Sequence, residues 1–244
     1  MNTQGPVETV VSLLDPALPL NTKFYRDMID RHGAASTLYY AAYRGVNRVA
    51  RTTLWDALVI TMDRLDPKIL SDPKCSMVQE VGAEALRRYV GQANTLSHEF
   101  LDAAAERKDR CFAVFEGEHL ANYGWYATQP TELVELGRDM LLQFDPAYVY
   151  MHNGFTDPKN RGQRLHAISM AVALATVCGE GRKGMVSYVA TSNFASLKSC
   201  ERMGYERVGR IASVKVGDKV RALVTPGCKP YGIQVIERPR QNAT

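Results

Sequence analysis

Thr156-Asp157-Pro158-Lys159-Asn160-Arg161-Gly162-Gln163-Arg164-Leu165-His166 lies between a predicted strand at residues 148–155 and an apolar segment, predicted to be helical, that runs to about residue 178. A strand that ends in a proline turn and leads through a basic loop into a helix exposes the unpaired N–H groups of the first helical turn. The helix dipole adds partial positive charge at the same point. Such a place binds phosphate or pyrophosphate, and Lys159, Arg161 and Arg164 add full charges to it.

A second strand–helix unit follows this loop. Residues 185–191 have the composition of a strand, and the segment from Asn193 to Tyr205 is predicted to be a helix. Asn193 or Ser192 can cap its first turn, and Gly204 is typical of a helix end. Apolar residues recur inside it at helical spacing, namely Phe194, Leu197, Cys200 and Met203. Two such units in a row predict a parallel pair of strands joined by a helix.

Together the two units resemble the GNAT superfamily, the acyl-CoA-dependent N-acyltransferases. The loop of that family reads roughly Pro-x-x-Arg-Gly-x-Gly-x-Gly, and its later helix reads Asn-x-x-Ser, followed by Tyr and Gly-Phe. The residues that match are Pro158, Arg161 and Gly162 in the loop, and Asn193, Ser196, Gly204 and Tyr205 in the helix. Order and spacing fit from about residue 54 to 236, so the resemblance covers most of the chain.

The chain departs from the family pattern at three positions. Arg164 and His166 stand where the family prefers glycine, which lets backbone N–H groups approach the pyrophosphate of CoA. A helical first turn needs no positive φ, so we expect both side chains to point away and leave that approach open. Cys200 stands where many members carry the tyrosine that protonates the leaving thiolate. A thiol can donate a proton, but a cysteine on an apolar helix face more commonly packs in the core.

The resemblance implies a site for acetyl-CoA or another acyl-CoA. The family pairs the strand just before the loop with the pantetheine arm, and an N–H at that point can polarise the thioester carbonyl. The cofactor-binding residues expected on this basis are Gly154, Phe155, Thr156, Arg161, Gly162, Gln163, Arg164, Leu165, His166, Asn193 and Ser196.

The resemblance also indicates where proton transfer is expected. Several members use a carboxylate base on the strand before the loop, but the matching residue here is Tyr150. Strand alternation puts Tyr148, Tyr150 and His152 on one face. His152 is the best replacement on chemical grounds, because an ordinary imidazole titrates near neutral pH. A passive role, as a hydrogen-bonded strand residue or as part of the acceptor pocket, remains the alternative.

Composition agrees with one enzyme of 244 residues, with 45% hydrophobic residues and a net charge of +4. The charge shows no concentrated basic face, so nucleic acid is not an expected partner. The five cysteines are widely spaced and, with the histidines, form no metal-binding pattern, so we expect no metal, reduced thiols and a cytoplasmic location. The first twenty residues lack the pattern of a signal peptide, and no apolar run is long enough for a membrane span.

The predicted fold is α/β (α+β): a GNAT-like central mixed, mostly antiparallel sheet with a splayed parallel pair, flanked by helices. We expect an N-terminal arm and helices in residues 1–50 and the acyltransferase domain in residues 51–240. Helices are predicted at residues 24–32, 37–49, 78–93, 96–107 and 132–142. Strands are predicted at residues 54–63, 111–115, 120–128, 207–216, 220–224 and 233–237, in addition to the pair described above.

The function predicted on this basis is transfer of an acetyl or other acyl group from CoA to the amine of a small molecule. Two alternatives stay open. One is a long-chain acyltransferase that uses acyl-CoA or acyl carrier protein, and the other is a non-catalytic CoA-binding or regulatory module. The absent carboxylate base and Cys200 motivate the second alternative. The acceptor and the oligomeric state, including a homodimer, are left undetermined.

Overall fold

The structure is a computed structural model. It describes residues 22–50, 52–92, 96–133, 135–136, 139–216 and 219–238. The predicted N-terminal arm at residues 1–20 lies outside the described residues, as does the turn at residues 217–218.

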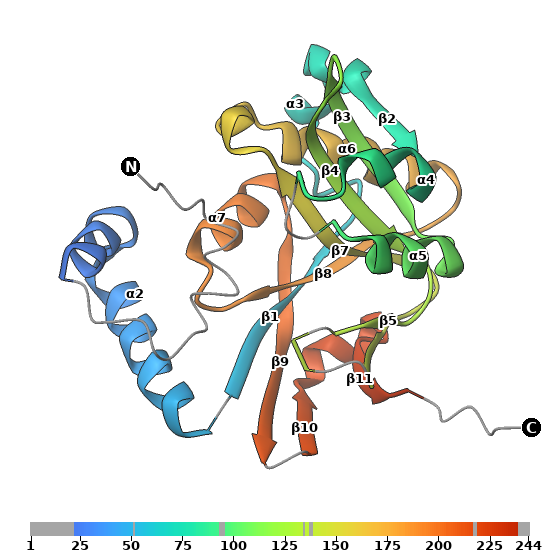
Figure 1. Cartoon of the computed structure of the whole chain (residues 1–244). Coiled ribbons are helices and arrows are strands. Elements are labelled where there is room, and N and C mark those ends of the chain that lie inside the picture. Colours follow the sequence, from blue (N-terminus) through green and yellow to red (C-terminus); the bar gives the residue numbers. More distant parts are fainter. Residues whose placement is uncertain are drawn as a thin grey trace, which may run out of the picture.

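An eight-stranded sheet forms the centre of the molecule (Figure 1). Its strand order is β10-β9-β1-β8-β7-β4-β3-β2, and every neighbouring pair is antiparallel except β7–β8. A second sheet has the order β11-β6-β5. This strand order and these strand directions confirm the predicted fold class, a mixed, mostly antiparallel sheet with one parallel pair. The strands are β1 (Thr52–Ile60), β2 (Val78–Val81), β3 (Arg110–Glu116), β4 (His119–Ala127), β5 (Thr131–Glu132), β6 (Met140–Gln143), β7 (Tyr148–Thr156), β8 (Gly184–Ala190), β9 (Glu206–Val216), β10 (Lys219–Val224) and β11 (Gln234–Glu237).

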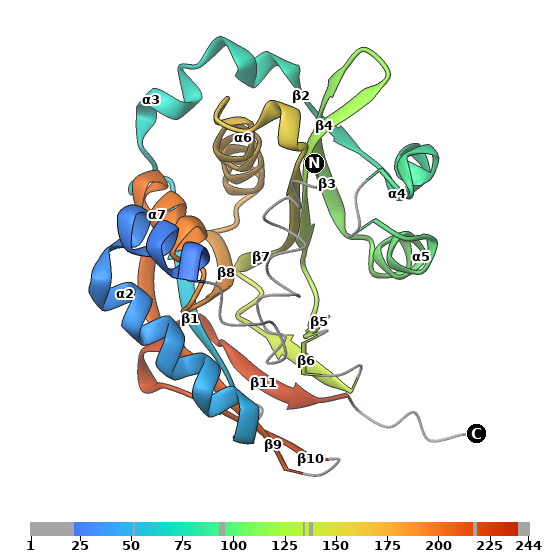
Figure 2. The ribbon, with the colours of Figure 1, turned by 60° about the vertical axis from the view of Figure 1, so that its left-hand side comes forward.

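Helices cover both faces of the large sheet (Figure 2). One face carries α6 (Leu165–Gly179) and α7 (Phe194–Met203), with the long α2 (Thr22–Ala50) beside α7. The opposite face carries α4 (Ala83–Leu86), α5 (His98–Arg107) and the small sheet. The short helix α3 (Pro67–Leu70) follows β1 and packs on α6.

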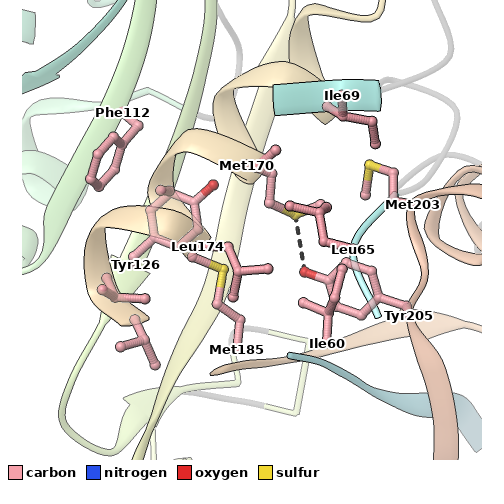
Figure 3. Close-up of a cluster of buried hydrophobic side chains, with 14 of the residues drawn as sticks. Ile60, Leu65, Ile69, Phe112, Tyr126, Met170, Leu174, Met185, Met203 and Tyr205 are labelled. Atoms are coloured by element: carbon pink, nitrogen blue, oxygen red, sulfur yellow. Dashed lines mark hydrogen bonds between the residues drawn. The ribbon is translucent and has the colours of Figure 1, made fainter. Parts of the chain in front are cut away.

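The core under α6 is continuous from helix to sheet (Figure 3). Met170 and Leu174 of α6 pack with Met185 of β8 and Tyr126 of β4. The hydroxyl of Tyr205 donates a hydrogen bond to the sulfur of Met170, 3.0 Å away. Because α6 is apolar on nearly every side and largely buried, the loop that precedes it is held firmly against the sheet.

Strands β7 and β8 separate part of the way along their length. They pair only from Tyr148 to Tyr150 on β7, against Gly184 to Val186 on β8. Beyond that point β7 stays bonded to β4, and β8 stays bonded to β1. The parallel pair is therefore splayed, as the resemblance implied, and backbone groups of both strands face the gap between them.

Two predicted helices are wrong. Residues 78–93 begin with the edge strand β2, and only short helical turns follow it. Residues 132–142 contain the end of β5 and the start of β6, and β6 pairs with β5 on one side and with β11 on the other. Polar residues such as Gln79 and Glu80 favour helix locally, but the free edge of β3 offers them partners that a helix does not. The two helices predicted at residues 24–32 and 37–49 are both present: they make up α2, which Gly33 interrupts with a non-helical conformation of φ 82° and ψ 164°.

Candidate active site

Where β7 separates from β8, the backbone edge of β7 and the face that carries Tyr150 and His152 lie next to each other. A bulge interrupts the pairing of β4 with β7, because Tyr126 pairs with Met151 and Trp125 pairs with Asn153, leaving His152 without a partner across the ladder. Bulges re-aim side chains and occur next to active sites. Here the bulge coincides with the point at which β7 leaves β8.

His152 is nearly buried, with 7% of its side chain exposed. Its ring packs on Tyr150, with ring centroids 5.5 Å apart, and on Phe100 of α5, at 5.9 Å. Nε2 lies 3.2 Å from Oδ2 of Asp109. Burial lowers the pKa of His152, while Asp109 opposes that shift. The imidazole is therefore neutral at neutral pH, which is the state a base requires.

Tyr150 also contacts Tyr188, which in turn contacts the carboxylate of Glu135. Its ring stacks on Tyr188 of β8, with centroids 5.9 Å apart, and a hydrogen bond links the two phenols. The Tyr188 hydroxyl donates to Oε2 of Glu135 at 3.0 Å. Burial raises the pKa of both tyrosines, so both stay protonated at neutral pH. The site thus has a continuous aromatic row, Phe100–His152–Tyr150–Tyr188, which runs across the splayed strands.

The loop after β7 is the segment for which the sequence predicts an anion site. The 3₁₀ turn Pro158–Asn160 is capped by Asp157, whose Oδ1 accepts from the N–H of Lys159 at 2.8 Å. Gly162 has φ 84°, and no side chain caps the N-terminus of α6. The N–H groups of Leu165, His166 and Ala167 therefore precede the first intrahelical bond, which the N–H of Ile168 donates to the carbonyl of Arg164 at 3.0 Å.

Arg164 corrects one expectation. The residue precedes α6 in the left-handed conformation, with φ 62° and ψ 13°, whereas we expected no positive φ in this stretch. Glycine adopts this conformation at no steric cost, which gives a physical reason for the glycine that the family prefers there. Arg164 is exposed.

His166 lies under the loop, in contact with β7. A Cβ placed on Gly154 would come within 2.9 Å of Cε1 of His166 and 2.8 Å of Cε of Met151. The glycine therefore makes room for the imidazole against the strand. Burial lowers the pKa of His166. Its position at the junction of β7 and α6 supports a packing role beside the predicted contact with CoA.

Lys74 contacts this loop, although the sequence did not indicate it. It belongs to the turn Pro73–Met77, and its Nζ lies 3.5 Å from the carbonyl oxygen of Gln163 and 3.4 Å from Oε1 of the same residue. Nothing in the local pattern of residues 73–77 points to the loop. The contact arises because this turn packs on α6.

Helix α7 completes the second unit. Asn193 caps it as predicted, with its side chain accepting from the N–H of Ser196 at 3.1 Å. Gly204 ends it with φ 102°. Cys200 packs against the core, and burial raises the pKa of its thiol to about 12. Such a thiol is a poor proton donor at neutral pH, which favours the packing alternative.

The other missed residues are Asp109, Arg107 and Glu135. Arg107 is the last residue of α5, and Asp109 and Glu135 lie in connections whose composition is that of ordinary polar segments. Only the tertiary structure brings Asp109 to His152 and Glu135 to Tyr188. Among the described residues no group of three His, Cys, Asp or Glu side chains is arranged to hold a metal ion. No helix in the described ranges has the length and hydropathy of a membrane span.

Neither a protein-family model nor a curated protein matches this chain. Among solved structures it is similar to an acetyltransferase of the GNAT family from Colwellia psychrerythraea, with 17% identity over 73% of this chain and 61% of that chain, and a TM-score of 0.49. It is also similar to a GCN5-related N-acetyltransferase from Sphaerobacter thermophilus, with 11% identity, 76% and 56% coverage, and a TM-score of 0.45.

An aminoglycoside N-acetyltransferase in complex with CoA aligns over 53% of this chain and 90% of its own length, with 15% identity and a TM-score of 0.42. This chain spans less than two thirds of the length of the first two acetyltransferases. The first two of these proteins carry in their names the family whose motifs this sequence resembles. At such identities their activities are not transferred to this chain, and its chemistry is argued from its own residues.

Proposed function

We propose that the protein is a GNAT-type N-acyltransferase that moves an acetyl or other acyl group from CoA to the amine of a small molecule. The observation that carries the proposal is the splay of β7 and β8 directly before an uncapped helix N-terminus. One end of this site suits an extended arm between two strands, and the other suits a pyrophosphate. Acyl-CoA combines both.

The roles of the loop follow from its charges and backbone. N–H groups at the start of α6 would bind the pyrophosphate, with Arg161 and Arg164 near it and Lys74 on the far side of Gln163. The edge of β7 at Gly154, Phe155 and Thr156 that faces away from β4 would pair with the pantetheine arm, and an N–H on that edge would polarise the thioester carbonyl. Asn193 and Ser196 would border the same arm from α7.

The acceptor amine would reach the thioester from the face of β7 that carries Tyr150 and His152. It must lose a proton before it attacks, and His152 would accept that proton. The amine nitrogen then forms a bond to the carbonyl carbon, and the carbon–sulfur bond breaks. The thiolate takes the second amine proton as it leaves. Five free cysteines fit the reducing cytoplasm as the location of this chemistry.

The donor site is tested by calorimetric titration with CoA and acetyl-CoA. Gly162→Ala imposes a side chain at φ 84° and should weaken CoA binding at least about tenfold, since the backbone then cannot hold the phosphates. Gly117→Ala is a matched control, because Gly117 has φ 62° and open space around it in the β3–β4 turn. It should lose similar stability and keep CoA affinity. Equal affinity in all three proteins would remove the proposed donor site.

Catalysis is tested separately, by thiol release from acetyl-CoA with a library of amines. Release that depends on an amine supports the transferase. CoA binding without release from acetyl-CoA or longer acyl-CoA would instead indicate the regulatory module. A preference for longer chains would point to the long-chain alternative, and acyl carrier protein would then be tried as donor.

A further inference from the structure

Asp109 is placed beside β7 by the way α5 ends. Lys108 takes the left-handed conformation that terminates the helix, with φ 58°, and the N–H of Asp109 donates to the carbonyl of Ala104 at 2.8 Å. The chain then enters β3 at Arg110. This turn directs the carboxylate inward, and none of the Asp109 side chain is exposed.

The carboxylate is shared between an arginine and the imidazole. Oδ2 accepts from Nε of Arg107 at 3.0 Å and from Nη2 at 2.6 Å, and it lies 3.2 Å from Nε2 of His152. Nε2 is buried and has no aligned hydrogen bond among the described residues, and neither has Oδ1 of Asp109. Catalytic hydrogen bonds are commonly long or poorly aligned before substrate binds. A buried carboxylate costs stability unless it is paired; Arg107 supplies that pairing for Asp109, and the geometry places the same oxygen at the ring of His152.

We propose that Asp109 is the positioning residue of His152, that it holds the proton on Nε2, and that Nδ1 is the nitrogen that accepts the proton of the acceptor amine. The inference deepens the proposed function and rests on it for the identity of the proton donor. The exposed 7% of the side chain does not include Nε2, which is buried, so the accessible part of the ring lies elsewhere.

The proton balance of this step is simple. An ammonium group of the acceptor gives one proton to Nδ1 and becomes a neutral amine. His152 becomes an imidazolium with protons on both nitrogens, and it later returns one proton to water. Asp109 stabilises the imidazolium, and Arg107 donates to the same carboxylate oxygen.

Three titratable or charged groups face this imidazole, from α5, from the connection after α5 and from β7. Asp109 raises the pKa of His152, Arg107 at the end of α5 lowers it, and Tyr150 of β7 packs on the ring. Asp109 and Arg107 thus act in opposite directions on one pKa. Variants that remove one of these two charges at a time should therefore shift the pKa of His152 in opposite directions. A merely structural role of Asp109 would not produce this pair of shifts.

The test is an NMR titration of the His152 ring, assigned with His152→Ala, in the wild type and two variants. Asp109→Asn keeps the shape and removes the charge, so the pKa of His152 should fall by about 1 unit or more. Arg107→Gln leaves Asp109 unneutralised, so the pKa should rise. The 15N shifts should show the Nε2–H tautomer in the wild type and a mixture in Asp109→Asn.

Asp56→Asn is the matched control. Asp56 is also a buried carboxylate, and it lies on the far side of the sheet. Two arginines bind it, Arg207 at 3.0 Å and Arg210 at 3.2 Å. This variant should lose stability and leave the pKa of His152 unchanged. A pKa that stays constant in both Asp109→Asn and Arg107→Gln, or that moves in the same direction in both, would overturn the proposal. If one variant does not fold, the direction seen in the other decides.

The acid limb of the pH–rate profile should follow the same two shifts, with kcat lowered at least about tenfold in Asp109→Asn and donor KM nearly constant. The NMR measurement needs no substrate. A protein that acetylates no amine would therefore refute the proposed function while the tautomer and the pKa shifts still judge the role of Asp109.

Discussion

Arg164 occupies a backbone conformation that costs a residue with a Cβ about 1–2 kcal/mol. Arg164→Gly and Arg164→Ala remove the same charge, but only glycine relieves the conformation. We expect the glycine variant to be more stable than the alanine variant by about 1 kcal/mol, measured by urea unfolding. Both should bind CoA more weakly than the wild type, because both lose a cation at the loop.

Lys108 provides the comparison, since it is the other non-glycine residue with positive φ among the described residues. Lys108→Gly and Lys108→Ala should show the same difference in stability and no change in CoA affinity. If the alanine variant at position 164 equalled the glycine variant in stability, the left-handed backbone at Arg164 would not be the source of strain.

The contact between elements β7 and α6 depends on Gly154. Because its missing Cβ leaves room for His166 and Met151, we expect Gly154→Ala to lower the free energy of unfolding by about 1–3 kcal/mol. Gly45→Ala is the control, since Gly45 lies in α2 with open space around it, and alanine there should stabilise by up to about 1 kcal/mol. Equal unfolding free energies for Gly154→Ala and the wild type would show that the helix yields readily at this point.

At the scale of the whole molecule, two buried imidazoles link folding to pH. Burial lowers the pKa values of His152 and His166 below the ordinary 6.5. The unfolded chain therefore binds protons below about pH 6.5 that the folded protein does not. This part of the stability is fully present above pH 6.5 and is lost as pH falls toward the folded pKa values.

Urea unfolding at pH 7.5, 6.5 and 5.5 should accordingly give a decreasing free energy of unfolding, with the loss mainly between the two lower values. His166→Leu should make the decrease smaller, because one of the two titrating groups is gone. Gly117→Ala, which we expect to lose stability because Gly117 has φ 62° and which has open space around it, should keep the full slope. An unchanged slope in His166→Leu would mean that His166 titrates alike in both states.

Local patterns in the sequence were enough for both strand–helix units. The Asn193 cap, the Gly204 stop and the loop before α6 depend on residues close to one another in the chain, and their propensities agree with the final structure. The edge strand β2 and the central strand β6 of the small sheet could not be predicted this way. Their stability comes from partners elsewhere in the chain, and their own residues fit a helix as well.

The loop, the capped helix and the strand carrying Tyr150 and His152 were determined by the sequence itself, because short-range hydrogen bonding and alternation specify them. Tertiary structure alone decided which charged side chains meet His152, Tyr188 and the loop. Asp109 comes from the end of α5, Glu135 from the connection after β5, and Lys74 from a turn that packs on α6. Long-range packing of the sheet sets these contacts, and a charged side chain in a connecting segment carries no local sign of the partner that it will meet.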